Sequence, residues 1–290
     1  MTPRTTPTVT AVPTDTDDLL RWRTDDAPAG TASLRLYGSA GQAHLAALEI
    51  DVRPEDRRRG AATALLGAAV DAAREHGRRT VLAQAEAGSP ADAFLAARGF
   101  RAVLTLLYAR LPLADADPAA MEALVARPHP GYRLVSWVGT VPDALLETFT
   151  ASRRAMDDMP MDDTDFGTVT WDTELVRTIA EKVAARGELL HTVAAVDESD
   201  GSIAGFTELV VPRSRTGDAQ HYGTGVLPEH RRRGLAAWMK AESIRWALTE
   251  QPSLEGLLTD TARSNTGMRA VNDALGYRLT HTSVQYQLEL

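Results

Sequence analysis

The chain contains no cysteine among its 290 residues. This absence excludes disulfide bonds, thiolate nucleophiles, cysteine zinc sites and iron–sulfur clusters. No window approaches the ~18 apolar residues that a membrane-spanning helix needs, and the first residues lack the apolar segment of a signal peptide. We therefore expect a cytoplasmic protein that does not act at a membrane.

Positive charge is not in excess either, because the formal net charge is −8 at pH 7. Nucleic-acid binding needs a basic surface, so that class is excluded, while a small cationic ligand is favoured. The seven histidines show no close ligand pairing such as His-x-x-x-His, and we expect no metal site. The length suits two domains, and the sequence leaves open whether two copies associate as a homodimer.

An internal repeat is the most informative feature present. Residues 50–62, IDVRPEDRRRGAA, recur as residues 224–236, TGVLPEHRRRGLA. Each copy follows a strand-like run and precedes a helical pattern, a short strand and a second helix that ends in Gly-aromatic, Gly99-Phe100 or Gly276-Tyr277. The copies lie 174 residues apart, which indicates two similar α/β domains rather than a solenoid.

The two halves differ in what precedes the repeat. We predict an N-terminal domain at 1–111, a linker with one short helix at 112–131, and a C-terminal domain at 132–290. The second domain begins with a strand at 132–138, a helix at 141–155 capped by Thr140, and a helix at 173–186; a hairpin of 191–196 and 203–211 follows. The N-terminal half lacks room for that pair of helices.

The turn between strand and helix carries the chemistry. The first turn of a helix leaves its backbone N–H groups unpaired, and the helix dipole makes that end electropositive. Small residues at 234 and 236 let a bulky anion approach these groups closely. The pattern predicts a pyrophosphate-binding loop, although it is neither Gly-x-Gly-x-x-Gly nor Gly-x-x-x-x-Gly-Lys.

With this motif the chain resembles the GNAT N-acetyltransferase superfamily, whose signature Gln/Arg-x-x-Gly-x-Gly/Ala matches residues 231–236 and, in the first half, 57–62. The resemblance implies an α/β fold of two tandem GNAT-like domains, each a mixed twisted sheet flanked by helices. It implies acetyl transfer from acetyl-CoA to the amine of a small molecule, by direct attack. The implied pantetheine and pyrophosphate contacts come from Thr224, Gly225, Val226, Arg231, Arg232, Arg233, Gly234, Leu235, Ala236 and Ala237.

The same resemblance distinguishes the two halves. Family members often bind the cofactor arm with an Asn eleven residues before the closing Gly, which is Asn265 in the second half and Gly88 in the first. The acid found on the fifth strand in some members is matched by Asp260 but by Ala83 in the first half. We therefore expect a degenerate N-terminal domain and a catalytic C-terminal one.

The general acid departs from the family pattern. Asn272 occupies the place where many members have a tyrosine that protonates the leaving thiolate. An Asn has no labile proton to give at neutral pH but can hydrogen-bond the thiolate or the backbone, so we count Asn272 among the cofactor contacts. Tyr222 on the preceding strand is the substitute acid, or else an aromatic side chain packed on the sheet.

Three side chains are candidates for the base that deprotonates the acceptor: Asp260, Glu208 and His221. Each also has a structural interpretation: Asp260 as a cap at a strand end, Glu208 as a solvated strand residue, and His221 as a residue without a role in the reaction. Asp157 and Asp158 begin a cluster of five carboxylates, completed by Asp162, Asp163 and Asp165, which either binds a cationic acceptor or forms a solvated loop. The rival function is a non-catalytic acyl-CoA-binding or regulatory module, which Asn272 would favour.

Overall fold

The computed structural model of the chain describes residues 7–25 and 29–290. It divides the chain into two compact units: unit 1 comprises Met1–Thr105, Met161–Thr170 and Ser283–Leu290, and unit 2 comprises Leu106–Pro160 and Trp171–Thr282. Each unit has its own hydrophobic core, and each is described separately below.

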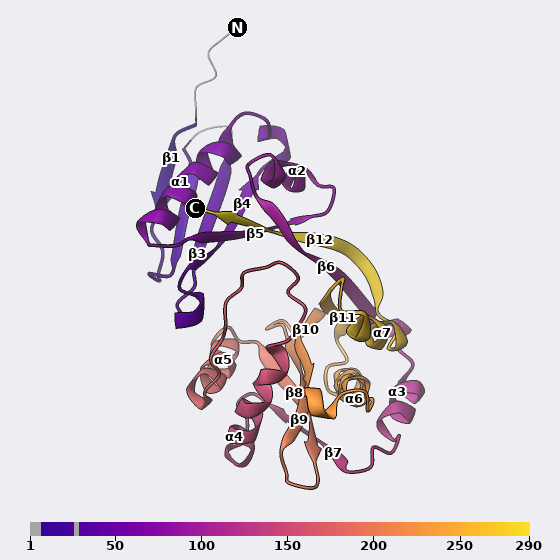
Figure 1. The fold of residues 1–290 in the computed structure, drawn as a ribbon. Coiled ribbons are helices and arrows are strands. Elements are labelled where there is room, and N and C mark those ends of the chain that lie inside the picture. Colours follow the sequence, from indigo (N-terminus) through magenta and orange to yellow (C-terminus); the bar gives the residue numbers. More distant parts are fainter. Residues whose placement is uncertain (1–6, 26–28) are drawn as a thin grey trace. The chain divides into compact units, whose positions relative to one another are not determined.

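Unit 1 contains a mixed sheet in the order β1-β2-β3-β4-β5-β12, in which only β4 and β5 run parallel. Helix α1 lies against β2, β3 and β4 and buries Leu65, Leu66 and Ala69 (Figure 1). The elements are β1 (Val9–Val12), β2 (Leu19–Thr24), β3 (Gly30–Leu36), β4 (Leu45–Val52), α1 (Ala61–Glu75), β5 (Thr80–Glu86), α2 (Pro90–Ala96) and the last residues of β12 (Arg278–Glu289).

Unit 2 contains a second mixed sheet in the order β6-β11-β10-β9-β8-β7, in which only β10 and β11 run parallel. Helices α4 and α5 cover one face, and α6 covers the other (Figure 1). The elements are β6 (Arg101–Pro112), α3 (Pro118–Val125), β7 (Tyr132–Val138), α4 (Asp143–Ser152), α5 (Thr173–Ala185), β8 (Leu189–Asp197), β9 (Ile203–Val211), β10 (Gly217–Val226), α6 (Leu235–Glu250), β11 (Leu254–Ala262) and α7 (Thr266–Ala274).

The last strand of each half completes the sheet of the other unit. Residues 106–112 of β6 pair with β11 in unit 2, whereas residues 283–289 of β12 pair with β5 in unit 1. The loop 161–170 also belongs to unit 1, where the backbone N–H of Asp165 bonds to the Gln287 side chain at 3.0 Å. The units therefore do not follow the uninterrupted ranges 1–111 and 132–290 that the sequence suggested.

Many local predictions are confirmed. The strand at 132–138, the hairpin of β8 and β9, and the short helix α3 in the linker are present. Ser89 caps α2, accepting the Asp92 N–H at 3.2 Å. The predicted cap of α4 is wrong: Pro142 occupies the N-cap position, and no side chain bonds there. No helix in the described part of the chain is long and apolar enough to cross a membrane.

Candidate cofactor and acyl-transfer site

The predicted pyrophosphate loop of unit 2, residues 231–237 (the cradle loop), leads from a short 3-10 turn into α6. Arg232 and Gly234 both have left-handed backbone conformations, with φ of 63° and 79°. Glycine adopts this region readily, whereas another residue is strained there. The two turns aim successive N–H groups to one side, which is the geometry of an anion-binding nest.

Six of the seven N–H groups of this loop have no acceptor among the described residues. Arg231 N–H bonds to Pro228 O and Trp238 N–H to Gly234 O, but residues 232–237 donate no hydrogen bond within the described chain. Gly234, the N-cap of α6, has no side chain that could serve as acceptor. Six donors therefore point out of the start of a 16-residue helix, where the dipole favours an anion.

Arg231 holds the cradle loop rather than facing outward as a free cation. Its Nε donates to Val226 O at 2.9 Å, and its guanidinium forms a bidentate pair with Asp158, with both contacts at 2.6 Å. This pair lowers the pKa of the Asp158 carboxyl. The predicted acceptor contact through Asp158 would have to compete with this ion pair, whereas Asp157 is exposed beside it.

The strands β10 and β11 separate next to the cradle loop. Their parallel pairing ends at Gln220 and Leu258, although β10 continues to Val226 and β11 to Ala262. On its other side β10 stays paired with β9, with an irregularity between His221 and Gly223. The β11 side of residues 224–226 is therefore an unpaired strand edge, as the predicted pantetheine contacts require.

Unit 1 repeats the loop but not its surroundings. Arg58 and Gly60 have φ of 64° and 99°, and Arg57 Nε bonds to Val52 O at 3.2 Å, as in unit 2. In unit 2 the side chain of Asn265 caps α7, accepting the Met268 N–H at 3.1 Å, and its Nδ2 has no partner among the described residues. Gly88 at the corresponding place offers no such donor.

Glu208 is buried and already paired. Its two carboxylate oxygens accept hydrogen bonds from Arg153 at 2.8 and 2.5 Å, and the exposed fractions of the two residues are 6% and 5%. The Arg153 guanidinium also lies over the Phe149, Trp171 and Phe206 rings at 4.6–4.9 Å. The buried ion pair argues against Glu208 as the base, because the Arg153 guanidinium already bonds to both oxygens that would accept the proton.

Asn272 lies in a buried polar group with Lys240, Thr261 and Tyr277. Lys240 Nζ donates to Asn272 Oδ1 at 2.8 Å, and Asn272 Nδ2 donates to Thr261 Oγ1 at 3.2 Å. Both ends of the amide are thus engaged inside unit 2, so the predicted cofactor contact of Asn272 would have to displace them. The Tyr277 ring lies under the Lys240 ammonium at 4.6 Å, and its hydroxyl has no partner in the described chain.

Lys240 is one of only two lysines in the sequence, and 1% of its surface is exposed. No carboxylate of the described chain forms an ion pair with it. Burial lowers the pKa of its ammonium from 10.5 to about 7, and the charge of Asp260 opposes part of this shift. A lysine in this environment exchanges its proton near neutral pH.

The three remaining catalytic candidates lie on β10 and β11. Asp260 accepts a hydrogen bond from Gln220 at 3.4 Å and remains open to solvent, while the protein packed around it raises the pKa of its carboxyl. His221 is buried, and burial lowers the pKa of its imidazole well below the ordinary value. Tyr222 is 54% exposed, with its hydroxyl 3.5 Å from Arg186, so it is not packed into the sheet.

Sequence reasoning missed three side chains near this site: Arg153, Lys240 and His129. The His129 ring stacks on Trp238, with centroids 4.1 Å apart, and a Cβ added at Gly234 would lie 3.3 Å from His129 Nε2. Thus the linker places the imidazole of His129, which can donate or accept a hydrogen bond, beside the cradle loop. The Pro-rich segment at 128–130 gave no signal of this contact.

Two other acidic residues of the predicted cluster, Asp163 and Asp165, make contacts within unit 1. Asp165 lies 3.2 Å from His44 in unit 1, and Asp163 N–H bonds to Val103 O there. The predicted cluster of five carboxylates is therefore divided between the two units. Among the described residues, no group of three or more His, Asp or Glu side chains is arranged to hold a metal ion.

Comparison with known proteins identifies the class of this fold and site. The acetyltransferase (GNAT) family pattern matches residues 10–100 and 154–277, so the chain belongs to that family. The two matched segments contain the cradle loop of unit 2 and its counterpart in unit 1, residues 57–63, which we also call a cradle loop, and the protein is a tandem GNAT protein. No curated protein matches the sequence.

Solved structures agree. A tandem GNAT protein from the clavulanic acid biosynthesis pathway, solved without acetyl-CoA, shares 25% identity over 98% of this chain and 84% of its own, with a TM-score of 0.76. A GCN5-related N-acetyltransferase from Sphaerobacter thermophilus shares 17% over 94% and 80%, with a TM-score of 0.65. One from Kribbella flavida shares 16% over 91% and 88%, with a TM-score of 0.58. The latter two support the fold alone.

Proposed function

We propose that unit 2 transfers the acetyl group of acetyl-CoA to the amine of a small, cationic acceptor. The observation that carries this proposal is the cradle loop: six N–H groups without an acceptor among the described residues, at the start of α6 and beside the edge of β10 that β11 leaves unpaired. These groups suit the pyrophosphate, the strand edge suits the pantetheine arm, and the free Nδ2 of Asn265 supplies a further donor.

In the proposed reaction the neutral amine attacks the thioester carbonyl carbon directly. The new C–N bond forms, the C–S bond breaks, and the electron pair leaves on the CoA sulfur. The proton of the attacking nitrogen goes to a base, and the thiolate takes up a proton from a donor or from water. We choose Asp260 as the base, because the pKa of its carboxyl is raised toward the neutral pH at which the reaction would run, and a base is most efficient when its pKa is near that pH. Tyr222 is the proposed donor.

The test compares matched substitutions in the two cradle loops. Gly234→Glu places a carboxylate where the pyrophosphate would bind, so acetyl-CoA-dependent thiol release with a panel of amines should be lost. Gly60→Glu adds the same side chain at the same left-handed backbone in unit 1 and should leave turnover within a few-fold. Loss of activity in Gly60→Glu alone would assign the active site to unit 1.

A non-catalytic acyl-CoA-binding module is the second candidate, favoured by the enclosed position of Asn272. It predicts that acetyl-CoA binds and that Gly234→Glu abolishes this binding. It also predicts that no amine releases the thiol. Calorimetry of both variants beside the thiol assay separates the two functions.

A further inference from the structure

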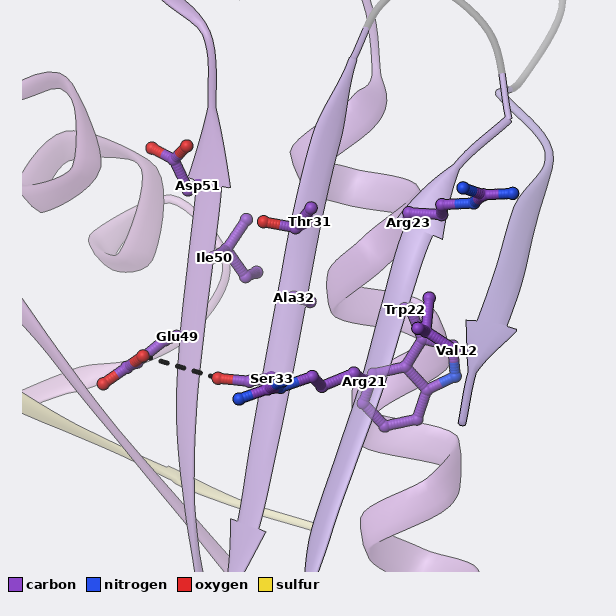
Figure 2. A pocket seen from close by; sticks show the side chains of 10 residues that line it. All are labelled: Val12, Arg21, Trp22, Arg23, Thr31, Ala32, Ser33, Glu49, Ile50 and Asp51. Atoms are coloured by element: carbon purple, nitrogen blue, oxygen red, sulfur yellow. Dashed lines mark hydrogen bonds between the residues drawn. The ribbon is translucent and has the colours of Figure 1, made fainter. Parts of the chain in front are cut away.

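The face of the unit 1 sheet opposite α1 carries two rows of side chains that run across the strands (Figure 2). In the first row Arg21 on β2 stands beside Ser33 on β3, which stands beside Glu49 on β4. In the second row Arg23 stands beside Thr31, which stands beside Asp51. Each row therefore reads cation, hydroxyl, anion.

The charges of these rows are not neutralised inside their own unit. Arg21, Arg23, Glu49 and Asp51 are exposed, and none forms an ion pair with another described residue. Within the described part of the chain, the side chains of the two rows form one hydrogen bond, from Ser33 Oγ to Glu49 at 3.4 Å. In each row the cation and the anion stand on strands two spacings apart, ~10 Å, with a hydroxyl residue between them.

The arrangement is self-complementary. A two-fold axis parallel to β3 and above this face exchanges the positions of β2 and β4. The residues of one row lie at one level along the strands, so Arg21 of one copy meets Glu49 of the second, and Arg23 meets Asp51 of the second. Such an axis gives the same patch on both partners, as the interface of a symmetric dimer requires.

We propose that this face joins two copies of the chain through four intermolecular ion pairs, two from each row. Stacked sheets lie ~10 Å apart, a distance that an arginine and a carboxylate pointing toward each other can span. A hollow of about 470 Å³ between the rows leaves space for the partner's side chains. Arg35 lies farther along β3 and therefore near the proposed axis, where it would face its own copy. Its guanidinium lies 3.9 Å from the Asp18 carboxylate of the same unit, and this negative charge weakens the repulsion between the two arginines.

The interface does not involve either cradle loop, so the proposal is independent of acetyl transfer. Ion pairs near solvent contribute little free energy each and are screened by salt. We therefore expect a weak, salt-sensitive dimer. Sedimentation of the full chain over a concentration series should show dimerisation at low salt and its loss at high salt.

Charge exchange tests which residues form the contact. Arg21→Glu with Arg23→Glu sets like charges opposite each other and should raise the dimer dissociation constant at least ~10-fold. Glu49→Arg with Asp51→Arg should do the same, and the fourfold variant should restore the dimer to within a few-fold. Arg74→Glu with Arg79→Glu is the control, because it changes the charge equally outside the two rows.

Circular dichroism spectra and melting curves of each variant verify that unit 1 remains folded. A wild-type chain that stays monomeric over the whole series overturns the proposal. So does a dimer that both double variants leave unchanged. A fourfold variant that stays as dissociated as the folded double variants would also overturn it, since restoration is what direct pairing requires.

Discussion

Replacing Lys240 by methionine should stabilise unit 2 at neutral pH and destabilise it in strong base. The side chain is buried, and among the described residues it forms one hydrogen bond, to Asn272, and no ion pair with a carboxylate. The depressed pKa means that the folded state releases a proton that the unfolded chain keeps. Wild-type stability therefore falls as the pH drops from 10.5 to about 7 and is constant below that range.

The size of this effect follows from the pKa values. The shift from 10.5 to about 7 corresponds, at ~1.4 kcal/mol per unit, to a loss of about 5 kcal/mol below pH 6 and about 4 kcal/mol at pH 7. Methionine cannot titrate and avoids this loss, but it leaves Asn272 Oδ1 without its donor, at a cost of ~1–3 kcal/mol. The net expectation is a gain of ~1–3 kcal/mol at pH 7, which reverses between pH ~8 and pH ~10.

Urea unfolding followed by tryptophan fluorescence measures this difference. Of the five tryptophans, all but Trp22 lie in unit 2, so the signal mainly reports that unit. Lys182→Met on α5 changes the only other lysine, which is exposed, and should show no such dependence on pH. A stability difference between Lys240→Met and wild type that stayed constant from pH 6 to pH 10 would refute the reasoning.

Three further outcomes are expected. Asp260→Asn should lower turnover ~10²–10⁴-fold while acetyl-CoA affinity stays unchanged; thiol-release kinetics across pH would contradict this by showing an unaltered rate and profile. Arg153→Met leaves the Glu208 carboxylate buried without a cation and should reduce the free energy of unfolding by ~3–5 kcal/mol; a loss below ~1 kcal/mol in urea titrations would show that the pair contributes little. Calorimetry should find one acetyl-CoA site per chain, held by unit 2, and two equal tight sites would defeat that assignment.

The features that the sequence predicted best depend on neighbouring residues. Gly60 and Gly234 stand where the backbone needs a left-handed turn, so their loops are recognisable without knowledge of the rest of the fold. The strands and helices that follow the loops have apolar patterns that match their buried faces. These local signals were sufficient for the family and for the cradle loop.

The interior of the site was less accessible to such reasoning. A lysine or arginine in a helical segment is usually exposed, so nothing along the chain marks Lys240 or Arg153 as buried. Glu208 could be recognised as a residue within an apolar strand, but its partner lies 55 positions away. The partners of β6 and β12 were missed because pairing between distant strands leaves no trace in either strand alone.

The position of β12 has a consequence for the folding of the chain during its synthesis on the ribosome. Unit 1 needs residues 283–289 to pair with β5, yet its main segment ends at residue 105. At ~5–20 residues per second, about 10–40 s of translation separate these two parts of the chain. During that interval the β5 edge has unpaired N–H and C=O groups, which attract other strands. The first half of the chain is therefore synthesised first, but its sheet is completed only when the final residues have been added.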